Sequence, residues 1–599
     1  MSTSDRRKTR PLVDAQTMAW VSIIGIAVIL AVLAWFAAVL GSALAGVNHK
    51  AIGAGPIAFV KALARHTATW PIWSTVLLIV FVVVAAAVII GAVILWGRLF
   101  GRRRTRVDSA AKYMGAGRDI APLTARSASQ TAQRLGVHGK PGVQIGRALA
   151  GNVPLYGSWE DMHVDIWGPR TGKTTSRAVP AILDAPGSVI VTSNKRDVAD
   201  ATRDVRAAAG PVWVFDPQKI AGEEPTWWWN PLSYVTDEVR ASKLAEHFAA
   251  GSRDGAGSHS NEFFDKAGQD LLAGLFLAAA LDKRPITDVY TWLTRPFDER
   301  PAELLREHGF PLTADQVAGV IGSPEKTRGS VYITAQQMAS CLTNRSVALW
   351  VTPVGGNLLG DQRPQFDPEA FVRSPGTLYS LSKEGRGTAG PLVTALTVAV
   401  IEAAEELAAQ SPMGRLPVPL VGVLDEAANV CRWRELPNLY SHFGSKGIVL
   451  MTILQSWSQG CEVWGESGMK KLWSASNVKV YGGGVSEAGF LDDLSRTVGD
   501  YERSATSTST GRDGHRSVSV QSQRDRILDL ADLAALPKGR AVVLASGARP
   551  TLIRTQPWMT GPHAAQVRAS IAAHDPQGQA TIRDAETELA QVTAREAVS

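Results

Sequence analysis

The sequence contains little cysteine. Only Cys341, Cys431 and Cys461 occur among 599 residues, and their spacing fits neither a zinc site nor a disulfide framework. We therefore expect all three thiols to be reduced, as in a cytoplasmic setting. No internal repeat is evident either. With 45% apolar and 20% charged residues, most of the chain should fold and bury a core, and its length exceeds that of one small domain.

Charged residues are absent from two stretches near the N-terminus. Residues 15–48 and 67–97 contain no Lys, Arg, Asp or Glu. Each stretch is longer than the roughly 20 apolar residues that cross a bilayer as a helix. The pattern predicts a membrane anchor over residues 1–106, with transmembrane helices at about 18–43 and 74–97.

Basic residues flank these stretches unevenly. They cluster at residues 6–10 and 98–106, whereas the segment between the stretches carries only Lys50, Lys61 and Arg65. The positive-inside bias then predicts a multi-pass protein of the inner (cytoplasmic) membrane with both termini in the cytoplasm. The net charge of +7 also suits a polyanionic partner, but an ordinary solvated surface with topology signals explains it equally well.

Short apolar runs beyond residue 150 predict strands. Most of these runs are continuous rather than alternating, which is typical of strands buried on both faces of a parallel sheet. Helical segments such as Ala389–Ala409 separate several of them, so the fold class is α/β with a doubly wound core. The predicted strands are His163–Trp167, Ser188–Ser193, Val212–Phe215, Thr377–Leu381, Pro419–Leu424, Ile448–Leu454, Val478–Tyr481 and Arg540–Ala545.

The segments between the runs suggest a domain order. No strand pattern is clear from 236 to 345, where Glu262–Leu281 and two shorter segments are helix-like, and the polar tract 503–523 is typical of a flexible surface loop. The sequence Trp227-Trp228-Trp229 could stack on bases, although such clusters more often pack under a domain interface. The expected order is a linker at 107–150, a nucleotide-binding domain at 151–235 and 346–562, an all-helical insertion at 236–345, and a helical tail at 563–599.

The strongest local signal is a glycine-rich loop between a predicted strand and a helix-capable segment. Such a loop directs backbone N–H groups toward phosphates, and the helix dipole adds positive charge. Lys173 would reach the β- and γ-phosphates of ATP, and the Thr174 hydroxyl would bind Mg²⁺. The loop is one residue shorter than usual, and a chance Gly-Lys-Thr turn is the alternative. The predicted nucleotide-binding residues are Gly168, Pro169, Arg170, Thr171, Gly172, Lys173, Thr174 and Thr175.

A second motif lies far along the chain, where the apolar run Pro419–Leu424 ends in Asp425 and Glu426. Asp425 would bind Mg²⁺ through water, and Glu426 would orient or deprotonate the attacking water. An acidic pair at the start of a helix is also a plain capping pattern, which is the alternative.

The next predicted strand, Ile448–Leu454, is followed by Gln455. The carboxyl ends of parallel strands share one edge of a sheet, so Gln455 could sense the γ-phosphate; a capping or structural role is the alternative. We therefore predict Lys173, Glu426 and Gln455 as catalytic residues, and Thr174 and Asp425 as metal ligands.

The order of these motifs resembles the VirD4/TraG/TraD coupling proteins of type IV secretion and conjugation. The combination is specific, whereas no single segment would be. The Ala/Arg-rich style and the segment Leu436–Gln459 resemble the actinobacterial branch. Besides the glycine loop, the matching segments are Val191–Val198, Val214–Pro217, Trp229–Leu232, Leu424–Asn429 and Gln455–Gln459.

The resemblance implies a hexameric ring of RecA-like P-loop NTPase cores that uses ATP and Mg²⁺. Its partners would be single-stranded DNA with a relaxase, the components of a secretion channel, and the inner membrane. ATP would lie at subunit interfaces, where a cation from a neighbouring subunit completes the site. Lys446 matches that position here, but it lacks the planar fork of arginine, and Arg496 and Arg170 are alternatives.

Three functions follow from this reading. The first is a membrane-anchored coupling ATPase that recruits a relaxase–DNA or protein substrate and drives its transfer. The second is a double-stranded DNA translocase of the FtsK/SpoIIIE kind, against which we see no winged-helix-like module after residue 560. The third is a membrane receptor that does not hydrolyse ATP, with the shortened glycine loop as its sign.

Overall fold

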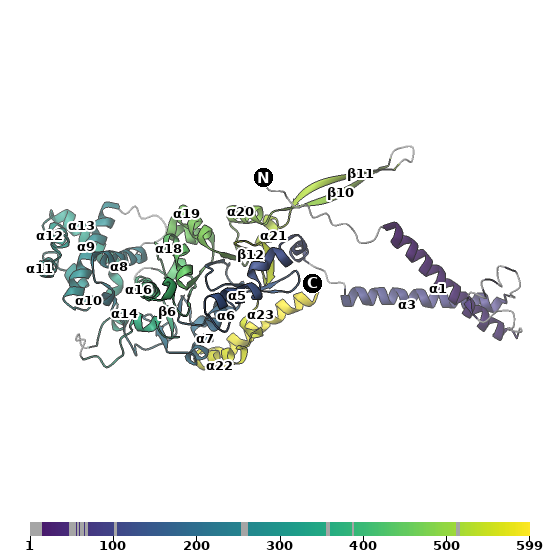
Figure 1. Cartoon of the computed structure of the whole chain (residues 1–599), viewed down its shortest axis with the longest axis horizontal. Helices are drawn as coiled ribbons and strands as arrows, with labels where there is room; N and C mark the ends of the chain where they lie inside the picture. Colours follow the sequence, from purple (N-terminus) through teal and green to yellow (C-terminus); the bar gives the residue numbers. More distant parts are fainter. Residues whose placement is uncertain are drawn as a thin grey trace. The chain divides into compact units, whose positions relative to one another are not determined.

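The chain forms two units, which we describe separately. The computed structural model describes residues 15–46, 55, 56, 59, 61, 65, 70–100, 105–252, 262–354, 360–385, 388–510 and 516–598 (Figure 1). The smaller unit comprises residues 1–104, 504–523 and 597–599, and the larger unit comprises residues 105–503 and 524–596.

The smaller unit contains two long helices, α1 (Ala15–Leu44) and α3 (Ile72–Phe100), which contact one another. They form over the two charge-free stretches. A membrane-crossing helix needs about 20 consecutive apolar residues, and no helix within the described ranges is both long and apolar enough to meet this condition. The predicted transmembrane helices at about 18–43 and 74–97 are therefore unsupported, and the predicted multi-pass inner-membrane localisation is wrong on this finding.

The larger unit is built on one eleven-stranded sheet with the order β2-β1-β13-β12-β9-β3-β8-β7-β4-β6-β5. From β9 to β5 every neighbouring pair is parallel, while β12, β13, β1 and β2 extend the sheet with antiparallel pairs. The strands are β1 (Val143–Ala148), β2 (Pro154–Gly157), β3 (His163–Ile166), β4 (Val189–Ser193), β5 (Val212–Phe215), β6 (Thr377–Leu381), β7 (Leu420–Leu424), β8 (Ile448–Leu454), β9 (Val478–Tyr481), β12 (Arg540–Ala545) and β13 (Thr551–Arg554).

The central strands are buried along their whole length. Every residue of β3, β4, β6, β7 and β8 is buried, as expected for strands covered on both faces. The predicted α/β class with a parallel sheet is thus confirmed. Register pairs Ile166 with Leu454 and Leu424 with Thr452, so the residues that follow β3, β7 and β8 meet at one edge of the sheet.

Some strands lie where we expected none. Strand β1 falls within residues 107–150, which we read as a linker, and it carries Gln144 and Arg147 and an irregular register between Gln144 and Gly146. The tract 503–523, expected to be a loop, contributes to strands β10 (Asp500–Thr510) and β11 (Arg516–Arg526), which pair with each other. Its β-branched threonines favour a strand, whereas its polarity had suggested a loop.

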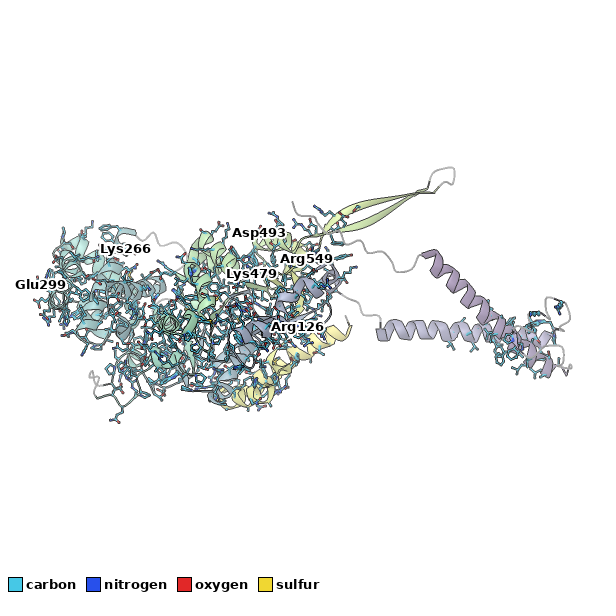
Figure 2. All side chains as sticks on the ribbon, in the orientation of Figure 1. Arg126, Lys266, Glu299, Lys479, Asp493 and Arg549 are labelled. Atoms are coloured by element: carbon cyan, nitrogen blue, oxygen red, sulfur yellow. The ribbon has the colours of Figure 1, made fainter. Side chains whose placement is uncertain are left out.

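Between β5 and β6 the described residues form helices and no named strand. Helix α9 is central to this insertion, because it contacts α8, α10, α11, α12 and α13 and buries Leu271, Leu275 and Phe276. These helices gather at one end of the larger unit in Figure 1; Lys266 and Glu299 mark them in Figure 2. The helices are α8 (Glu238–Ser252), α9 (Glu262–Leu281), α10 (Thr287–Leu293), α11 (Arg300–Glu307), α12 (Pro311–Ile321), α13 (Glu325–Met338) and α14 (Arg345–Val351).

An aromatic cluster joins the insertion to the sheet. Trp227 packs edge-on against Trp213 of β5 at 5.2 Å and against Trp350 of α14 at 5.4 Å between ring centroids. The rings of Trp227 and Trp229 are buried. Base stacking requires an accessible ring face, so the structure favours the interface alternative for the triple tryptophan.

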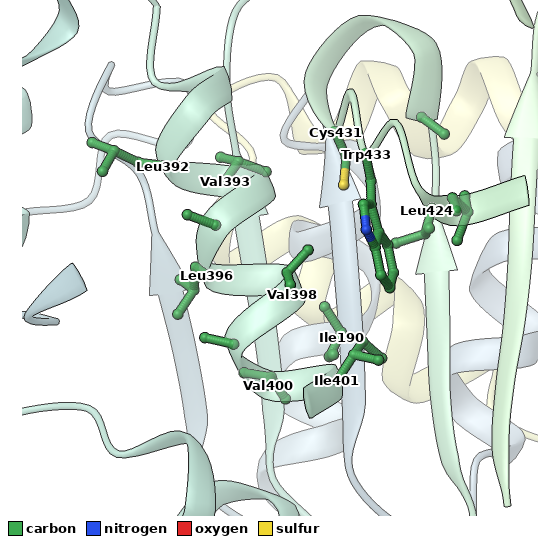
Figure 3. Close-up of a cluster of buried hydrophobic side chains, with 14 of the residues drawn as sticks. Ile190, Leu392, Val393, Leu396, Val398, Val400, Ile401, Leu424, Cys431 and Trp433 are labelled. Atoms are coloured by element: carbon green, nitrogen blue, oxygen red, sulfur yellow. The ribbon is translucent and has the colours of Figure 1, made fainter. Parts of the chain in front are cut away.

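Helices cover both faces of the sheet. Helix α16 (Gly390–Gln410) lies on one face, where Leu396 and Ile401 belong to the same buried cluster as Ile190 of β4 and Trp433 (Figure 3). The other face is covered by helices that include α7 (Asp197–Ala207), on which α22 (Ala564–His574) packs. Helix α23 (Gly578–Val598) follows α22 in sequence. Residues of both C-terminal helices join Val179 of α6 (Val179–Asp184) in one apolar cluster.

A buried ion pair fastens β3 to the helical turn after the glycine loop. Arg177 Nε lies 2.6 Å from Asp165 Oδ2, and both side chains are fully buried. Arg177 also contacts His163 Nδ1 at 3.2 Å. Burial, together with the charge of Arg177, keeps the pKa of His163 well below its usual value, so this ring is neutral and leaves Asp165 as the counter-ion.

We predict that Asp165→Ala lowers the free energy of unfolding by about 3–5 kcal/mol, because it leaves the Arg177 guanidinium buried without its counter-ion. The matched control is Asp315→Ala, which removes an exposed partner of Arg306 at 3.0 Å and should change stability by about 1 kcal/mol or less. Urea unfolding followed by tryptophan fluorescence measures both. Equal shifts for the two variants would contradict the structural role of the buried pair.

Candidate functional site

The glycine-rich loop connects β3 to a helical turn. The turn begins at Thr174, runs through Ala178, and continues into α6. The Ser176 N–H donates to the Gly172 carbonyl at 3.0 Å, so the chain is already helical beside Lys173. Gly172 has a φ of +91°, a conformation that residues with a Cβ rarely adopt. The loop therefore presents the start of a helix at the carboxyl edge of the sheet, the arrangement that binds phosphates.

The first glycine of the loop is fixed by a neighbouring turn. The Gly168 N–H donates to the Gly483 carbonyl at 2.8 Å, and a Cβ on Gly168 would lie 2.0 Å from the Gly484 oxygen. Glycine is therefore needed at 168 for close backbone contact with the turn that follows β9. The sequence did not reveal this contact between two backbones.

Lys173 lies between the two acidic residues that follow β7. Its Nζ is 3.0 Å from Asp425 Oδ1 and also bonds to Glu426 Oε1. The side chains are buried, with exposures of 14% for Lys173, 4% for Asp425 and 3% for Glu426. Residues from two distant parts of the chain thus form one compact charge cluster.

Burial and neighbouring charges set the ionisation of this cluster. Burial raises the pKa of Asp425 to about 6, in spite of the opposing charge of Lys173. Burial acts to lower the pKa of Lys173, but the charges of Asp425 and Glu426 outweigh it and raise that pKa. Near neutral pH the cluster therefore holds a cationic lysine beside an ionised Asp425.

Gln455 completes the cluster from β8. Its Nε2 lies 2.7 Å from Oε1 and 2.8 Å from Oε2 of Glu426. Glu426 itself has a left-handed backbone with a φ of +56° and makes no side-chain cap on the short helix α17 (Ala427–Val430) that follows. The geometry thus disfavours the capping alternative for Glu426, and it places the Gln455 amide on the carboxylate.

Polar residues after other strands extend the cluster, and the sequence did not single them out. Asn429 Nδ2 donates to Glu426 Oε2 at 3.2 Å and to Glu384 Oε1 at 2.9 Å. Asn194 Nδ2 donates to the same Glu384 oxygen at 2.5 Å. Asn194 follows β4 and Glu384 follows β6, so a polar residue just beyond each buried strand was the available signal.

The remaining loop residues surround this cluster. The hydroxyl of Thr171 donates to the Gly168 carbonyl at 2.6 Å, and that of Thr175 donates to the Gly172 carbonyl at 3.1 Å. Pro169 and Arg170 are exposed, and Thr174 is half-buried at the start of the helical turn, next to Lys173.

Two of the three candidate finger residues, Lys446 and Arg496, lie away from this cluster within the chain, whereas Arg170 is an exposed residue of the glycine loop itself. Lys446 sits just before β8 begins, at the opposite edge of the sheet from Gln455, and pairs with Glu405 at 2.5 Å. Arg496 is an exposed residue of α20 (Ala488–Val498) and pairs with Asp492 of the same helix. A finger supplied by a neighbouring subunit would not need to approach its own chain's site, so these assignments stay predictions.

The residues present fit a magnesium–nucleotide complex. Mg²⁺ prefers hard oxygen ligands such as the Asp425 carboxylate. The Thr174 hydroxyl is a second such oxygen, and it lies next to Lys173 at the start of the helical turn. The buried acidic pair already holds one cation, the Lys173 ammonium. In the part of the chain that the structure describes, no group of three or more His, Cys, Asp or Glu residues forms a separate metal site.

Comparison with known proteins matches part of the chain to one family and most of it to one fold. Residues 419–538 match the family described as the TraM recognition site of TraD and TraG. The bacterial conjugative coupling protein TrwB, without its first 70 residues, has a similar structure: its unbound form shows 16% identity and a TM-score of 0.51, covering 72% of this chain and 92% of the truncated TrwB chain. Its form in complex with sulphate shows 14% identity, a TM-score of 0.50 and the same coverage.

No curated protein sequence matches the chain significantly. The structural similarity shows a shared fold at low identity, and the family match covers β7, β8, β9 and the segment that contains Asp425, Glu426 and Gln455. The resemblance to the VirD4/TraG/TraD-type coupling proteins that the motifs indicated is therefore confirmed, in the matched segment 419–538 and in the fold of the larger unit.

Proposed function

We propose that the chain is a P-loop ATPase that acts as a coupling protein in conjugative DNA transfer. One observation carries the proposal: Lys173, Asp425, Glu426 and Gln455, from three segments far apart in sequence, converge at the carboxyl edge of a parallel sheet with the fold of a coupling protein. Phosphoryl transfer needs placed charges and an oriented water more than covalent chemistry. This cluster supplies the charges, and Glu426 is the group that would orient the water.

In the proposed reaction, a water oxygen bonds to the γ-phosphorus of ATP while the bond to the bridging β–γ oxygen breaks, so that ADP and phosphate form. Glu426, held by Gln455 and Asn429, orients the water and accepts its proton. Lys173 leaves the two carboxylates and stabilises the charge on the β- and γ-phosphates. When bound, Mg²⁺ neutralises phosphate charge, and Asp425 and Thr174 are the residues that would hold it.

The substrate side of the proposal draws on the similarities. TrwB is described as a conjugative coupling protein, and the matched family is named for recognition of TraM by TraD and TraG. We propose that the helical insertion, α8 to α14, receives a relaxase bound to single-stranded DNA. We further propose that six copies form a ring in which Lys446 of a neighbouring subunit completes each ATP site, and that the substrate passes to a secretion channel.

Hydrolysis of ATP by the full chain, with and without single-stranded and duplex DNA, tests this function. We expect stimulation by single strands. Glu426→Gln should lower kcat by about 10²–10⁴-fold, the usual contribution of a placed general base, while still binding nucleotide. Lys173→Ala should weaken nucleotide binding as well. A suitable control is Lys538→Ala, a partly exposed residue outside the helical insertion that pairs with Glu588 at 2.9 Å.

Two outcomes would replace the proposal. Stimulation by duplex DNA alone would favour a translocase of the FtsK/SpoIIIE kind. Absence of both hydrolysis and nucleotide binding under all conditions would leave a receptor built on an ATPase fold.

The pKa of Asp425 predicts a pH dependence for Mg²⁺ binding. Because burial raises this pKa to about 6, the carboxyl group is neutral below that pH and loses its charge for the metal. The affinity of the ADP complex for Mg²⁺ should therefore be constant above about pH 7 and fall as the pH drops through 6, by up to about tenfold per unit. Isothermal titration from pH 5 to 8 measures this.

The control for the pH prediction is Asp425→Asn. It should bind Mg²⁺ more weakly than wild type above pH 7 and lose less affinity between pH 7 and 5, because only the phosphates of ADP then titrate. If the variant and wild type lose affinity equally, Asp425 is not the ligand.

A further inference from the structure

Glu487 links two parts of the site that the reaction scheme above treats separately. It precedes α20, and its carboxylate accepts the N–H of Trp457 at Oε2 and the N–H of Ser458 at Oε1, both at 2.9 Å. These amides belong to the first turn of α19 (Trp457–Ala475), whose N–H groups have no partner within the helix. A carboxylate at this position also interacts favourably with the helix dipole.

One side of this link is the catalytic glutamine. Gln455 stands two residues before Trp457, and its side chain donates to both oxygens of Glu426. Its own backbone N–H donates to Gln459 Oε1 at 3.2 Å, in the first turn of α19. The position of the α19 N-terminus therefore sets the position of the Gln455 amide.

The other side of the link is the glycine loop. Glu487 follows the turn Gly482–Gly484, which lies directly against Gly168 and Thr171. The Gly482 N–H donates to the Ile166 carbonyl at 3.0 Å, and the Gly168 N–H donates to the Gly483 carbonyl at 2.8 Å. Movement of the glycine loop thus moves the turn from which Glu487 extends.

Aromatic side chains pack α19 and α20 against one another. Phe490 of α20 stacks on Trp457 at 5.4 Å between ring centroids and packs edge-on against Trp473 at 5.7 Å. Tyr481 of β9 packs against the same Phe490 at 5.8 Å. Glu487 consequently lies between the N-terminus of α19, which packs on α20, and the Gly482–Gly484 turn.

We infer that Glu487 is a positioning residue that sets Gln455 relative to the phosphate-binding loop, so that hydrolysis depends on it more than nucleotide binding does. A continuous chain of contacts runs from the glycine loop through the Gly482–Gly484 turn, Glu487, the α19 N-terminus, Gln455 and Glu426 back to Lys173 of the glycine loop. A capping role alone would stabilise only the fold, whereas this chain of contacts links the position of Gln455 to that of the phosphate-binding loop. This inference rests on the proposed ATPase function.

The test compares Glu487→Gln with wild type and with Glu462→Gln, an exposed glutamate on the same helix α19. The glutamine keeps the size of the side chain, but only one of its terminal atoms can accept, so one of the two amides loses its partner. For the full chain with Mg²⁺ and ATP we expect kcat to fall by about 10- to 100-fold, as misplacement of a catalytic group does. The Kd for a fluorescent ADP should change less than about twofold, and Glu462→Gln should behave as wild type.

Hydrogen exchange of the same proteins separates this inference from the ATPase function. In the presence of ADP and Mg²⁺, Glu487→Gln should increase exchange in peptides that cover 166–176 as well as 455–460. An unchanged kcat would overturn the inference. So would a loss of nucleotide affinity as large in fold-change as the loss of kcat, accompanied by a lower melting temperature. If wild type does not hydrolyse ATP, the proposed function fails, and exchange then tests only whether Glu487 positions Gln455 relative to the glycine loop: an increase confined to 457–460 overturns this positioning role, and one that also reaches 166–176 supports it.

Discussion

The contact of Lys173 with Asp425 and Glu426 is the interaction on which the rest of the site depends. Two carboxylates buried side by side repel one another and lose their hydration, so each needs a compensating charge. Here a single ammonium serves both. This arrangement suits a reaction in which Mg²⁺ and a polyphosphate bind together, because Asp425 and Thr174 would hold the metal and its charge would compensate the carboxylates if Lys173 moved to the phosphates.

The parallel sheet is what makes this contact possible. Strands β3, β7 and β8 are neighbours or near neighbours in the order of the sheet, and the residues beyond their carboxyl ends converge although they are far apart in sequence. On the β9 side, the glycine loop is supported by its backbone contact with the Gly482–Gly484 turn. On the β4 and β6 side, Asn429 and Asn194 both donate hydrogen bonds to Glu384. The Glu426 carboxylate thereby has hydrogen-bond partners from both directions.

Much of this arrangement could be predicted from the sequence. Continuous apolar runs predicted β5, β6, β8, β9 and β12 with the bounds that the structure has. For β6 and β8 the reason is that strands buried on both faces leave little freedom in composition. The convergence of Asp425 and Gln455 followed from the rule that parallel strands end at one edge. The antiparallel strands β1, β2 and β13 were missed because polar residues, Gly or Pro interrupt or flank their apolar residues. The hairpin β10–β11 was misread because its Ser/Thr-rich composition is also typical of loops.

The rest of the site depends on tertiary contacts that no local pattern encodes. Glu487 resembles an ordinary surface residue in the sequence, and only the packing of α19 and α20 gives it partners. The apolar N-terminal stretches were over-interpreted for the opposite reason. Their composition alone suggested membrane spans, but among the described residues no helix has the length and apolar character that a span requires.

The most direct test of the account is an experimental structure of the full chain with Mg²⁺ and an ADP–fluoride complex that mimics the transferring phosphate. The account predicts that Lys173 Nζ leaves Asp425 and Glu426 for the phosphate oxygens, that Mg²⁺ lies near Asp425 and the Thr174 hydroxyl, and that Gln455 stays on Glu426. A nucleotide bound elsewhere, with Lys173 still between the two carboxylates, would contradict it.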